Sequence, residues 1–431
     1  MLPSKRGWMH DIWLSHDMRD RRPFRAPAPA SPPGIVMTVM TASPVAARQA
    51  TTRHGVVLMA AAVMPAMAII SLVPVLPLLL REFAAVPGAA FLVPIALTIP
   101  ALCVAIFSPA AGWLSDRVGR KWVQVTALVL YGLIGLMPLY LTSLTWIVVS
   151  RVLLGLMEAA ITTVATTLIG DYYDGERRER WIAIQTAVVS LSAIVLIAAG
   201  GILGEMLGSR GPFLLYLLAL PIGLFSAIIL FEPPATRTTA QQTLFPFARV
   251  LPIVAITLGA ALLFYTMLIQ IGPIMEIAGV TSPAAIGGAG AAANFGVVIG
   301  ALIFRRGAQQ NRTLLLAAGF ALAAIGYVGV SQFSGFWIVA MFAVISCVGG
   351  GVLLPTLLTW VMQVLPPAAR GRGTGLWTGT FFLAQFMAPL LAVALTELTG
   401  GLKPALLIFG IGAAGAAAIA GVASRRGPAT G

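Results

Sequence analysis

Apolar stretches of about 20 residues or more recur along this 431-residue chain, and they restrict its fold more than any other feature of the sequence. A helix of about 20 apolar residues is long enough to span the hydrocarbon core of a bilayer. Hydrophobic residues make up 59% of the chain and charged residues only 10%. The sequence therefore predicts an all-α polytopic membrane protein.

Charged or Pro/Gly-rich breaks divide the apolar sequence into twelve predicted spans. The one long polar stretch between spans is EPPATRTTAQQTLFPFAR, residues 232–249. Twelve helices with both chain ends on one side of the membrane are the simplest arrangement that follows. The predicted spans are 55–80, 88–114, 122–142, 144–170, 181–204, 212–231, 250–273, 283–304, 313–331, 335–362, 373–397 and 402–423.

Two short patterns recur about half a chain apart. GWLSDRVG from Gly112 and GALIFRRG from Gly300 share Gly, Leu, Arg and Gly at the same offsets, and RERW from Arg178 matches RGRG from Arg370 in Arg-x-Arg. Transporters are often built from duplicated bundles. The repeat predicts two parallel six-helix bundles joined by a linker and flanked by tails. The predicted parts are a disordered cytoplasmic tail (1–53), a first bundle (54–231), a linker (232–249), a second bundle (250–423) and a cytoplasmic tail (424–431).

The distribution of basic residues predicts the orientation, because short loops rich in Lys and Arg stay in the cytoplasm. Fifteen basic residues lie on the side predicted to be cytoplasmic and three on the other, Arg81, Arg210 and Lys403. Both termini are therefore expected inside. The fifteen are Arg117, Arg120, Lys121, Arg177, Arg178, Arg180, Arg237, Arg249, Arg305, Arg306, Arg312, Arg370, Arg372, Arg425 and Arg426.

Other function classes find little support in the sequence. The net charge of +13 comes from basic residues scattered over short loops, so no nucleic-acid partner is expected. The three histidines lie in the tail or at its end, and no His/Cys/carboxylate set has metal-ligand spacing. Cys103 and Cys347 fall within spans, which favours small buried side chains over a disulfide. With no catalytic constellation, P-loop or cofactor motif, neither an enzyme nor an ATP-driven pump is expected, and a proton gradient is the expected energy source.

GWLSDRVGRK, residues 112–121, concentrates four charged side chains and two glycines between predicted spans two and three. It resembles the signature of the major facilitator superfamily, Gly-x-Leu-x-Asp-Arg-x-Gly-Arg-Lys. Span four carries a second feature of that family, Arg-x-x-x-Gly-x-x-x-Ala, in Arg151, Gly155 and Ala159. The resemblance covers residues 55–423 and implies a monomeric secondary transporter that moves a small solute by alternating access. The first signature is met by Gly112, Leu114, Asp116, Arg117, Gly119, Arg120 and Lys121.

The first motif is expected to act as a gate. Gly112 would allow close helix packing, and Gly119 would take a positive φ in a tight turn. Asp116 would lie near the start of span eleven, where backbone N–H groups favour an anion and glycines at 371, 373 and 375 leave room. In family terms the cluster holds the two halves together when the protein opens outward. The alternative is a turn that serves only as a topology signal.

Span four also holds the candidate proton carrier. An ionisable residue near the middle of a span is costly, so it is a functional candidate by default. Arg151 and Glu158 are seven residues apart and share one helix face, about 10 Å apart along the axis. We expect Glu158 to carry the proton and Arg151 to modulate it or contact an anionic solute group. The alternative is a structural ion pair or polar contact that holds span four to span one or span five.

Further residues are expected at the solute cavity or at the span ends. Near the midplane, Ser190, Ser192, Tyr265, Asn294 and Gln385 are candidates to line the cavity, with Trp360 and Trp377 nearer the cytoplasm. Glu205, Glu276 and Glu397 lie near outer span ends, where surface anchoring is expected.

Export of drugs or metabolites is the first functional hypothesis, and proton-linked uptake of a sugar or organic acid is the alternative. A non-transporting sensor on the same fold would tolerate loss of Glu158. The departures from drug antiporters are a span one without an acidic residue and a span five with Gly200 and Gly201 but no Gly-Pro. Arginine outnumbers lysine 24 to 3, which is typical of GC-rich bacteria and suggests a bacterial inner membrane.

Overall fold

A computed structural model describes residues 50–233, 245–307, 311–366 and 369–425, and the statements below refer to these ranges. Within them nearly every residue is helical and there is no strand. The predicted tails therefore lie outside the described residues except at their inner ends, and so does most of the predicted linker. The prediction of disorder for residues 1–49 falls outside these ranges as well.

The first half of the chain contains six predicted spans, and all six are helical. Span one is interrupted, because Pro74 and Pro77 lack the N–H groups that would continue the helix. The elements are α1 (Thr52–Ile70), η1 (Val73–Val75), α2 (Leu76–Glu82), α3 (Ala89–Val118), α4 (Arg120–Leu136), η2 (Met137–Leu139), α5 (Leu144–Tyr172), α6 (Gly175–Leu207), η3 (Gly208–Leu218) and α7 (Ala219–Ile229).

The second half repeats this pattern over its described residues, including the interruption in its first span. The break between α8 and α9 at Gln270 corresponds to the break between α1 and α2. Eleven helical segments of the described ranges are long and apolar enough to cross a membrane. One of them, Gly175–Ile229, has 55 residues and covers both predicted span five and predicted span six. The elements are α8 (Phe247–Ile269), α9 (Ile271–Ile277), α10 (Pro283–Gly307), α11 (Arg312–Gln332), α12 (Phe336–Val364), α13 (Arg370–Thr399) and α14 (Leu402–Arg425).

The two faces of the bundle differ in charge. We call the face where α3 ends and α4 begins the basic face, because most loop arginines lie there. The opposite face carries the ends of α2, α6 and α9, with Arg81 and Arg210.

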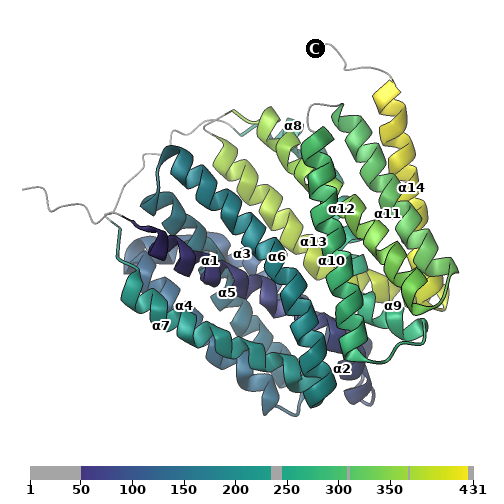
Figure 1. The fold of residues 1–431 in the computed structure, drawn as a ribbon, viewed down its shortest axis with the longest axis horizontal. Helices are drawn as coiled ribbons and strands as arrows, with labels where there is room; N and C mark the ends of the chain where they lie inside the picture. The colour runs from purple at the N-terminus through teal and green to yellow at the C-terminus, as the bar shows by residue number, and fades with distance from the viewer. Residues whose placement is uncertain (1–49, 234–244, 308–310, 367–368, 426–431) are drawn as a thin grey trace, which may run out of the picture. The chain divides into compact units, whose positions relative to one another are not determined.

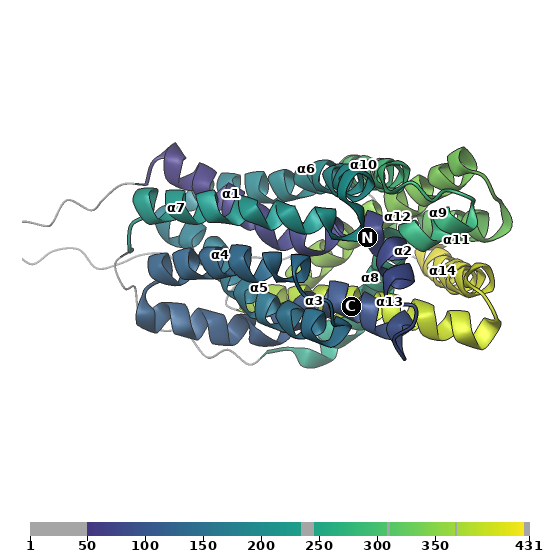
Figure 2. The ribbon, with the colours of Figure 1, turned by 90° about the horizontal axis from the view of Figure 1, so that it is seen from below.

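Two helix pairs join the halves. α6 packs on α10 and α3 packs on α13, and both views show α6 and α10 side by side (Figures 1 and 2). Glycines make the first contact close: a Cβ on Gly201 would lie 2.5 Å from the Pro283 carbonyl oxygen and 3.0 Å from the Gly287 Cα. In α10, Gly296 and Gly300 form a GxxxG pair that approaches the α12 backbone, so this pair packs within the bundle.

Because the atoms facing Gly201 belong to backbone, they cannot move aside by rotating a side chain. We expect Gly201→Ala to cost about 1–3 kcal/mol of stability and to lower the Tm of the purified protein in detergent. Gly288→Ala is the matched control, since no atom lies within 4 Å of the added Cβ. Equal Tm values for the two variants would contradict this packing.

Polar contacts also join the halves at the opposite face. An Arg81 nitrogen lies 3.2 Å from a Glu276 oxygen, which connects α2 to α9. Glu205 of α6 accepts hydrogen bonds from the Ser282 hydroxyl (2.7 Å) and from the Ala284 N–H (3.3 Å) at the start of α10. Glu205 and Glu276 lie at span ends on this face, where the sequence places them, and each carboxylate also binds the other half of the chain. These contacts connect the two halves at the opposite face.

Candidate functional site

The motif of residues 112–121 is helical at nearly every position, and not the loop that the sequence suggested. α3 continues to Val118 and α4 begins at Arg120, so only Gly119 leaves the helix. Its φ is +107°, which confirms the predicted positive value. The close-packing role expected for Gly112 is not seen, since an added Cβ would make ordinary contact with Thr163 at 3.6 Å.

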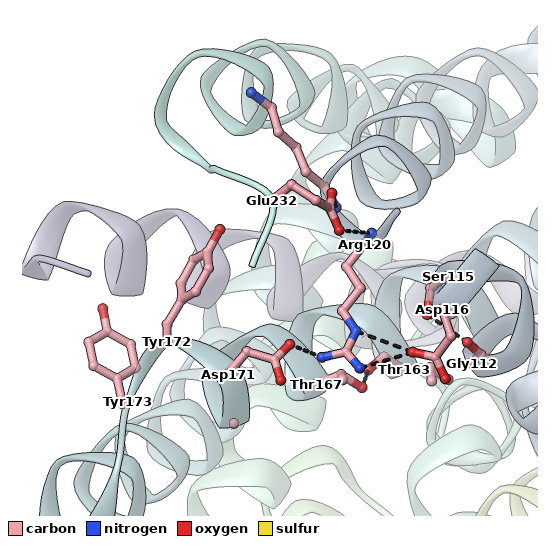
Figure 3. A network of polar contacts seen from close by, with 12 residues as sticks. Gly112, Ser115, Asp116, Arg120, Thr163, Thr167, Asp171, Tyr172, Tyr173 and Glu232 are labelled. Carbon is pink, nitrogen blue, oxygen red and sulfur yellow. Dashed lines mark hydrogen bonds and ion pairs between the residues drawn. The ribbon is translucent and has the colours of Figure 1, made fainter. Parts of the chain in front are cut away.

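Arg120 is the centre of a cluster of charges on the basic face, shown in Figure 3. Its Nη2 lies 2.9 Å from the Asp116 Oδ1, and its Nη1 donates to the Asp171 carboxylate. The Arg120 and Asp171 side chains are only 21% and 19% exposed, whereas Asp116 is 62% exposed. This arrangement places Asp116 against its own half of the chain.

Glu232, which follows α7, closes the start of α4. Its carboxylate accepts hydrogen bonds from the backbone N–H groups of Arg120 (2.6 Å) and Lys121 (2.9 Å). The first N–H groups of a helix have no partner within it and favour an anion. A Cβ on Gly119 would lie 3.1 Å from this carboxylate, so glycine also leaves room for it. Sequence reasoning missed Asp171 and Glu232, although both are acids beside span ends that are rich in arginine.

The remaining motif residues make local contacts. The Arg117 guanidinium lies 4.1 Å from the Trp113 ring centroid, and the Lys121 ammonium lies 5.3 Å from that of Trp122. Leu114 is exposed. At the start of α13, no atom lies within 4 Å of the position a Cβ would take on Gly371 or Gly375.

We expect Arg120→Ala to lower stability by about 2 kcal/mol, because charged hydrogen bonds to two carboxylates are lost. Arg117→Ala is the control: the only contact described for that guanidinium is with Trp113, worth about 0.5 kcal/mol at an exposed site. Thermal unfolding of both purified variants measures the difference. An equal loss would mean that the cluster contributes nothing beyond a single surface cation.

Arg151 is a residue of α5 and is 1% exposed. Its side chain lies beside the C-terminal end of α4, the end away from Arg120. Its Nη2 donates to the Gly135 carbonyl at 3.3 Å, and its Nη1 donates to the Tyr216 hydroxyl at 3.0 Å. The guanidinium also lies 5.2 Å from the ring centroids of Phe213 and Tyr216. A cation at a helix C-terminus is favourable. Arg151 thus holds α5 to α4 and η3. This is a structural contact of the kind considered as the alternative, but its partners belong to spans three and six and not to span one or five.

Glu158 lies two turns further along α5 and is 1% exposed. Its Oε2 is buried and has no hydrogen-bond partner among the described residues. Arg151 is within electrostatic range, yet no ion pair joins the two side chains in those residues. Gly155 allows α5 to approach α3 closely at Pro100 and Cys103, which positions this part of the helix.

Groups of both halves lie within electrostatic range of Glu158. In the first half they include Cys103 and Tyr131. In the second half they include Tyr265 on α8, whose ring centroid is 4.8 Å from that of Phe381 on α13. Phe381 in turn stacks on Trp377 at 5.4 Å and 9°. We call Tyr265, Phe381 and Trp377 the aromatic surface. One turn beyond Phe381, Gln385 is buried and its Oε1 has no partner within the described ranges.

The other cavity candidates are satisfied by their own helices. Ser190 and Ser192 donate to the carbonyls of Thr186 and Val189 in α6. Asn294 is buried in α10 and donates to the Gly290 carbonyl at 3.0 Å. Of the five candidates, Tyr265 lies within electrostatic range of Glu158, and Gln385 has a buried oxygen without a partner among the described residues.

Comparison with known families finds a match over most of the chain. Residues 57–389 match the family described as Major Facilitator Superfamily. The chain belongs to this superfamily. The match runs from α1 into α13 and so includes both halves. It confirms the resemblance first carried by residues 112–121 and 151–159.

Curated relatives of this major facilitator protein include resistance proteins. The putative multidrug resistance protein MdtD of Yersinia pseudotuberculosis serotype I (strain IP32953) is 32% identical over 127 residues, which cover 30% of this chain and 27% of the relative. The class B tetracycline resistance protein of Escherichia coli is 31% identical over 179 residues, covering 41% and 43%. The alignments therefore span less than half the length of either relative.

Solved structures share the fold over most of the chain. A bacterial homolog of the human lysosomal transporter Spinster, inward-facing and unoccupied, has a TM-score of 0.70 at 17% identity and covers 87% of this chain and 98% of its own. The POT family transporter PepTSo has a TM-score of 0.68 at 13% identity, covering 88% and 98%. This major facilitator protein is thus a multi-pass membrane transporter and not an enzyme.

Proposed function

We propose that this chain is a proton-coupled exporter that exchanges a proton on Glu158 for a solute bound between its halves. The observation that carries the proposal is the Glu158 carboxyl group: it is buried, its Oε2 is unpartnered among the described residues, and it lies within electrostatic range of Tyr265 in the other half. A carboxyl group at such a depth is costly to keep ionised without a partner. A proton or a positively charged solute group would supply that partner.

Solute transport is coupled to proton transport because the proton and the solute compete for the Glu158 carboxyl group. When the proton is bound, Glu158 is neutral and attracts no cation. When a cationic solute binds, the Glu158 carboxylate balances its charge, and Tyr265, Phe381 and Trp377 contact its apolar part. The faces of these aromatic rings also attract a cation. Glu158 thereby provides the carboxylate that span one lacks. The resistance functions named for the two relatives support efflux of drugs or metabolites.

The basic face is the cytoplasmic face in this proposal, because basic loops stay inside. Both termini are then cytoplasmic, the membrane is a bacterial inner membrane, and the transporter works as a monomer without a cofactor. The contacts between the halves at the opposite face support an inward-facing arrangement, as in the Spinster homolog. Asp116 is then free to leave Arg120 for the start of α13 when the protein opens outward.

Proton movement in everted membrane vesicles tests this proposal. Vesicles with and without the intact chain are energised, and the pH gradient is followed while lipophilic cations, organic anions and sugars are added one at a time. We expect one or more lipophilic cations to dissipate the gradient only where the chain is present.

Two outcomes would contradict the proposal. If cells that express the chain accumulate a sugar or organic acid, and no solute dissipates the gradient in vesicles, the protein is an uptake system. If no solute moves in either direction, a sensor role replaces transport. In both cases Glu158 returns to a structural role.

A further inference from the structure

Unpartnered buried polar atoms are concentrated in the first half of the chain. Eight buried side-chain nitrogen and oxygen atoms lack a partner within the described residues, and six of them lie on α4, α5 and α7. Leaving such an atom unpaired costs about 1–3 kcal/mol, and buried polar groups without a protein partner are usually bound to ordered water. The six atoms are Gln124 Oε1 and Nε2, Arg151 Nε, Glu158 Oε2, Thr162 Oγ1 and Ser226 Oγ.

The helix register places two of these residues between Glu158 and the basic face. On the antiparallel helices α5 and α4, Arg151 contacts Gly135 and Asp171 contacts Arg120 near the basic face. Thr162 is one helical turn beyond Glu158 on α5 towards the basic face. Gln124 is one turn from Arg120 on α4. Both polar residues therefore lie between the level of Glu158 and the Arg120 cluster.

Ser226 on α7 lies close to the depth of Gln124. A Cβ on Gly223 would be 3.4 Å from the Leu128 Cβ, which sets the register between α7 and α4. Ser226 is three residues beyond Gly223 and Gln124 is four residues beyond Leu128, both towards the basic face. The Ser226 and Gln124 side chains are fully buried, each 0% exposed. Three helices therefore each contribute a polar group without a partner among the described residues, all between Glu158 and the Arg120 cluster.

The polar positions continue to the basic face. One turn beyond Gln124 on α4 is Arg120, which binds Asp116 and Asp171. Figure 3 shows Thr167 next to this cluster, on the same helix as Asp171. Polar groups thus follow one another from Glu158 to the charged cluster at intervals of about one turn.

A proton that leaves Glu158 needs a polar path to water on the basic face. Glu158 is only 1% exposed although the halves meet at the opposite face. Its carboxyl group is therefore separated by side chains from water on the basic face, and a proton that leaves it must cross them.

We propose that Gln124, Thr162 and Ser226 hold a file of water molecules that carries the proton from Glu158 to the basic face. The proton leaves through the first half of the chain, and the solute moves between the halves. The inference rests on the proposed function, since it assigns the route of the proton that Glu158 exchanges.

The transfer is balanced at each step. The Glu158 O–H bond breaks as a neighbouring water accepts the proton, and each water passes one proton to the next. The hydroxyls of Thr162 and Ser226 can take part, whereas the Gln124 amide orients the waters by donating and accepting hydrogen bonds. The last water delivers the proton to bulk water beside the Arg120 cluster.

Gln124→Leu and Ser226→Ala in the full chain test the route, with Ser150→Ala as the matched control. Ser150 is buried on α5 but donates to the Ile147 carbonyl, away from the proposed file. Two rates are compared in vesicles: proton movement driven by an exported lipophilic cation, and exchange of labelled for unlabelled cation at equal pH, which needs no net proton transfer. We expect the two route variants to lower proton movement by about tenfold or more, as for loss of a positioned proton-transfer group, while exchange stays unchanged.

Each other outcome overturns the route. Proton movement within about twofold of the intact chain in both variants would show that the polar atoms are not on the path. An equal fall of exchange and proton movement would assign them to folding; if Gln124→Leu does not fold, Ser226→Ala alone decides. Failure of the proposed function is distinguishable, because Glu158→Gln would then keep its proton movement.

Discussion

Glu158→Gln is expected to abolish proton movement driven by an exported solute, a loss of about 100-fold or more, in line with removal of a group that exchanges protons. Glutamine has nearly the same shape as glutamate, so the packing of α5 against α3 is kept. It cannot gain or lose a proton, and therefore cannot couple solute to proton. Vesicles with a pH-sensitive dye measure the rate.

Glu158→Asp is the control for that result. It keeps a carboxyl group but withdraws it by one methylene from the other half, so we expect slower exchange that remains coupled to protons. Equal proton movement in the intact chain and in Glu158→Gln would remove Glu158 from the coupling.

The second large effect is expected from Arg151→Met. The substitution removes a buried guanidinium that donates to Tyr216 and to the end of α4, and we expect a loss of about 3 kcal/mol, the range for hydrogen bonds to charged groups. Arg151→Lys should lose less, because an ammonium keeps the charge but cannot reach all the acceptors in one plane. Thermal unfolding of the purified variants in detergent gives the order.

If the Tm is highest for the intact chain, lower for Arg151→Lys and lowest for Arg151→Met, Arg151 serves to hold the helices together. An unchanged Tm in Arg151→Met, combined with loss of proton movement, would contradict that assignment. Arg151 would then act mainly by modulating Glu158.

The spans and the family could be predicted from the sequence, because both depend on local signals. Runs of apolar residues set the helices, and the turn at Gly119 follows from a glycine between charged residues. The sequence also singled out Glu158, since a carboxylate in the middle of an apolar span has few structural explanations.

Contacts between distant residues could not be predicted in the same way. Glu232 binds the N–H groups at the start of α4 from more than 100 residues away, and Glu205 binds the start of α10. Which side chain meets which helix end depends on the packing of whole helices, and no pattern in one sequence fixes it. For the same reason the sequence predicts the position of Glu276 at a span end but not its ion pair with Arg81.

In the proposed function, the Glu158 carboxyl group exchanges its proton for a bound solute. The most direct measurement is the number of protons released into weakly buffered detergent solution when a transported cation binds to the purified protein. We expect the intact chain to release protons when the cation binds, and Glu158→Gln to release none when the same fraction of the protein has bound the cation. Equal release from both proteins would contradict it.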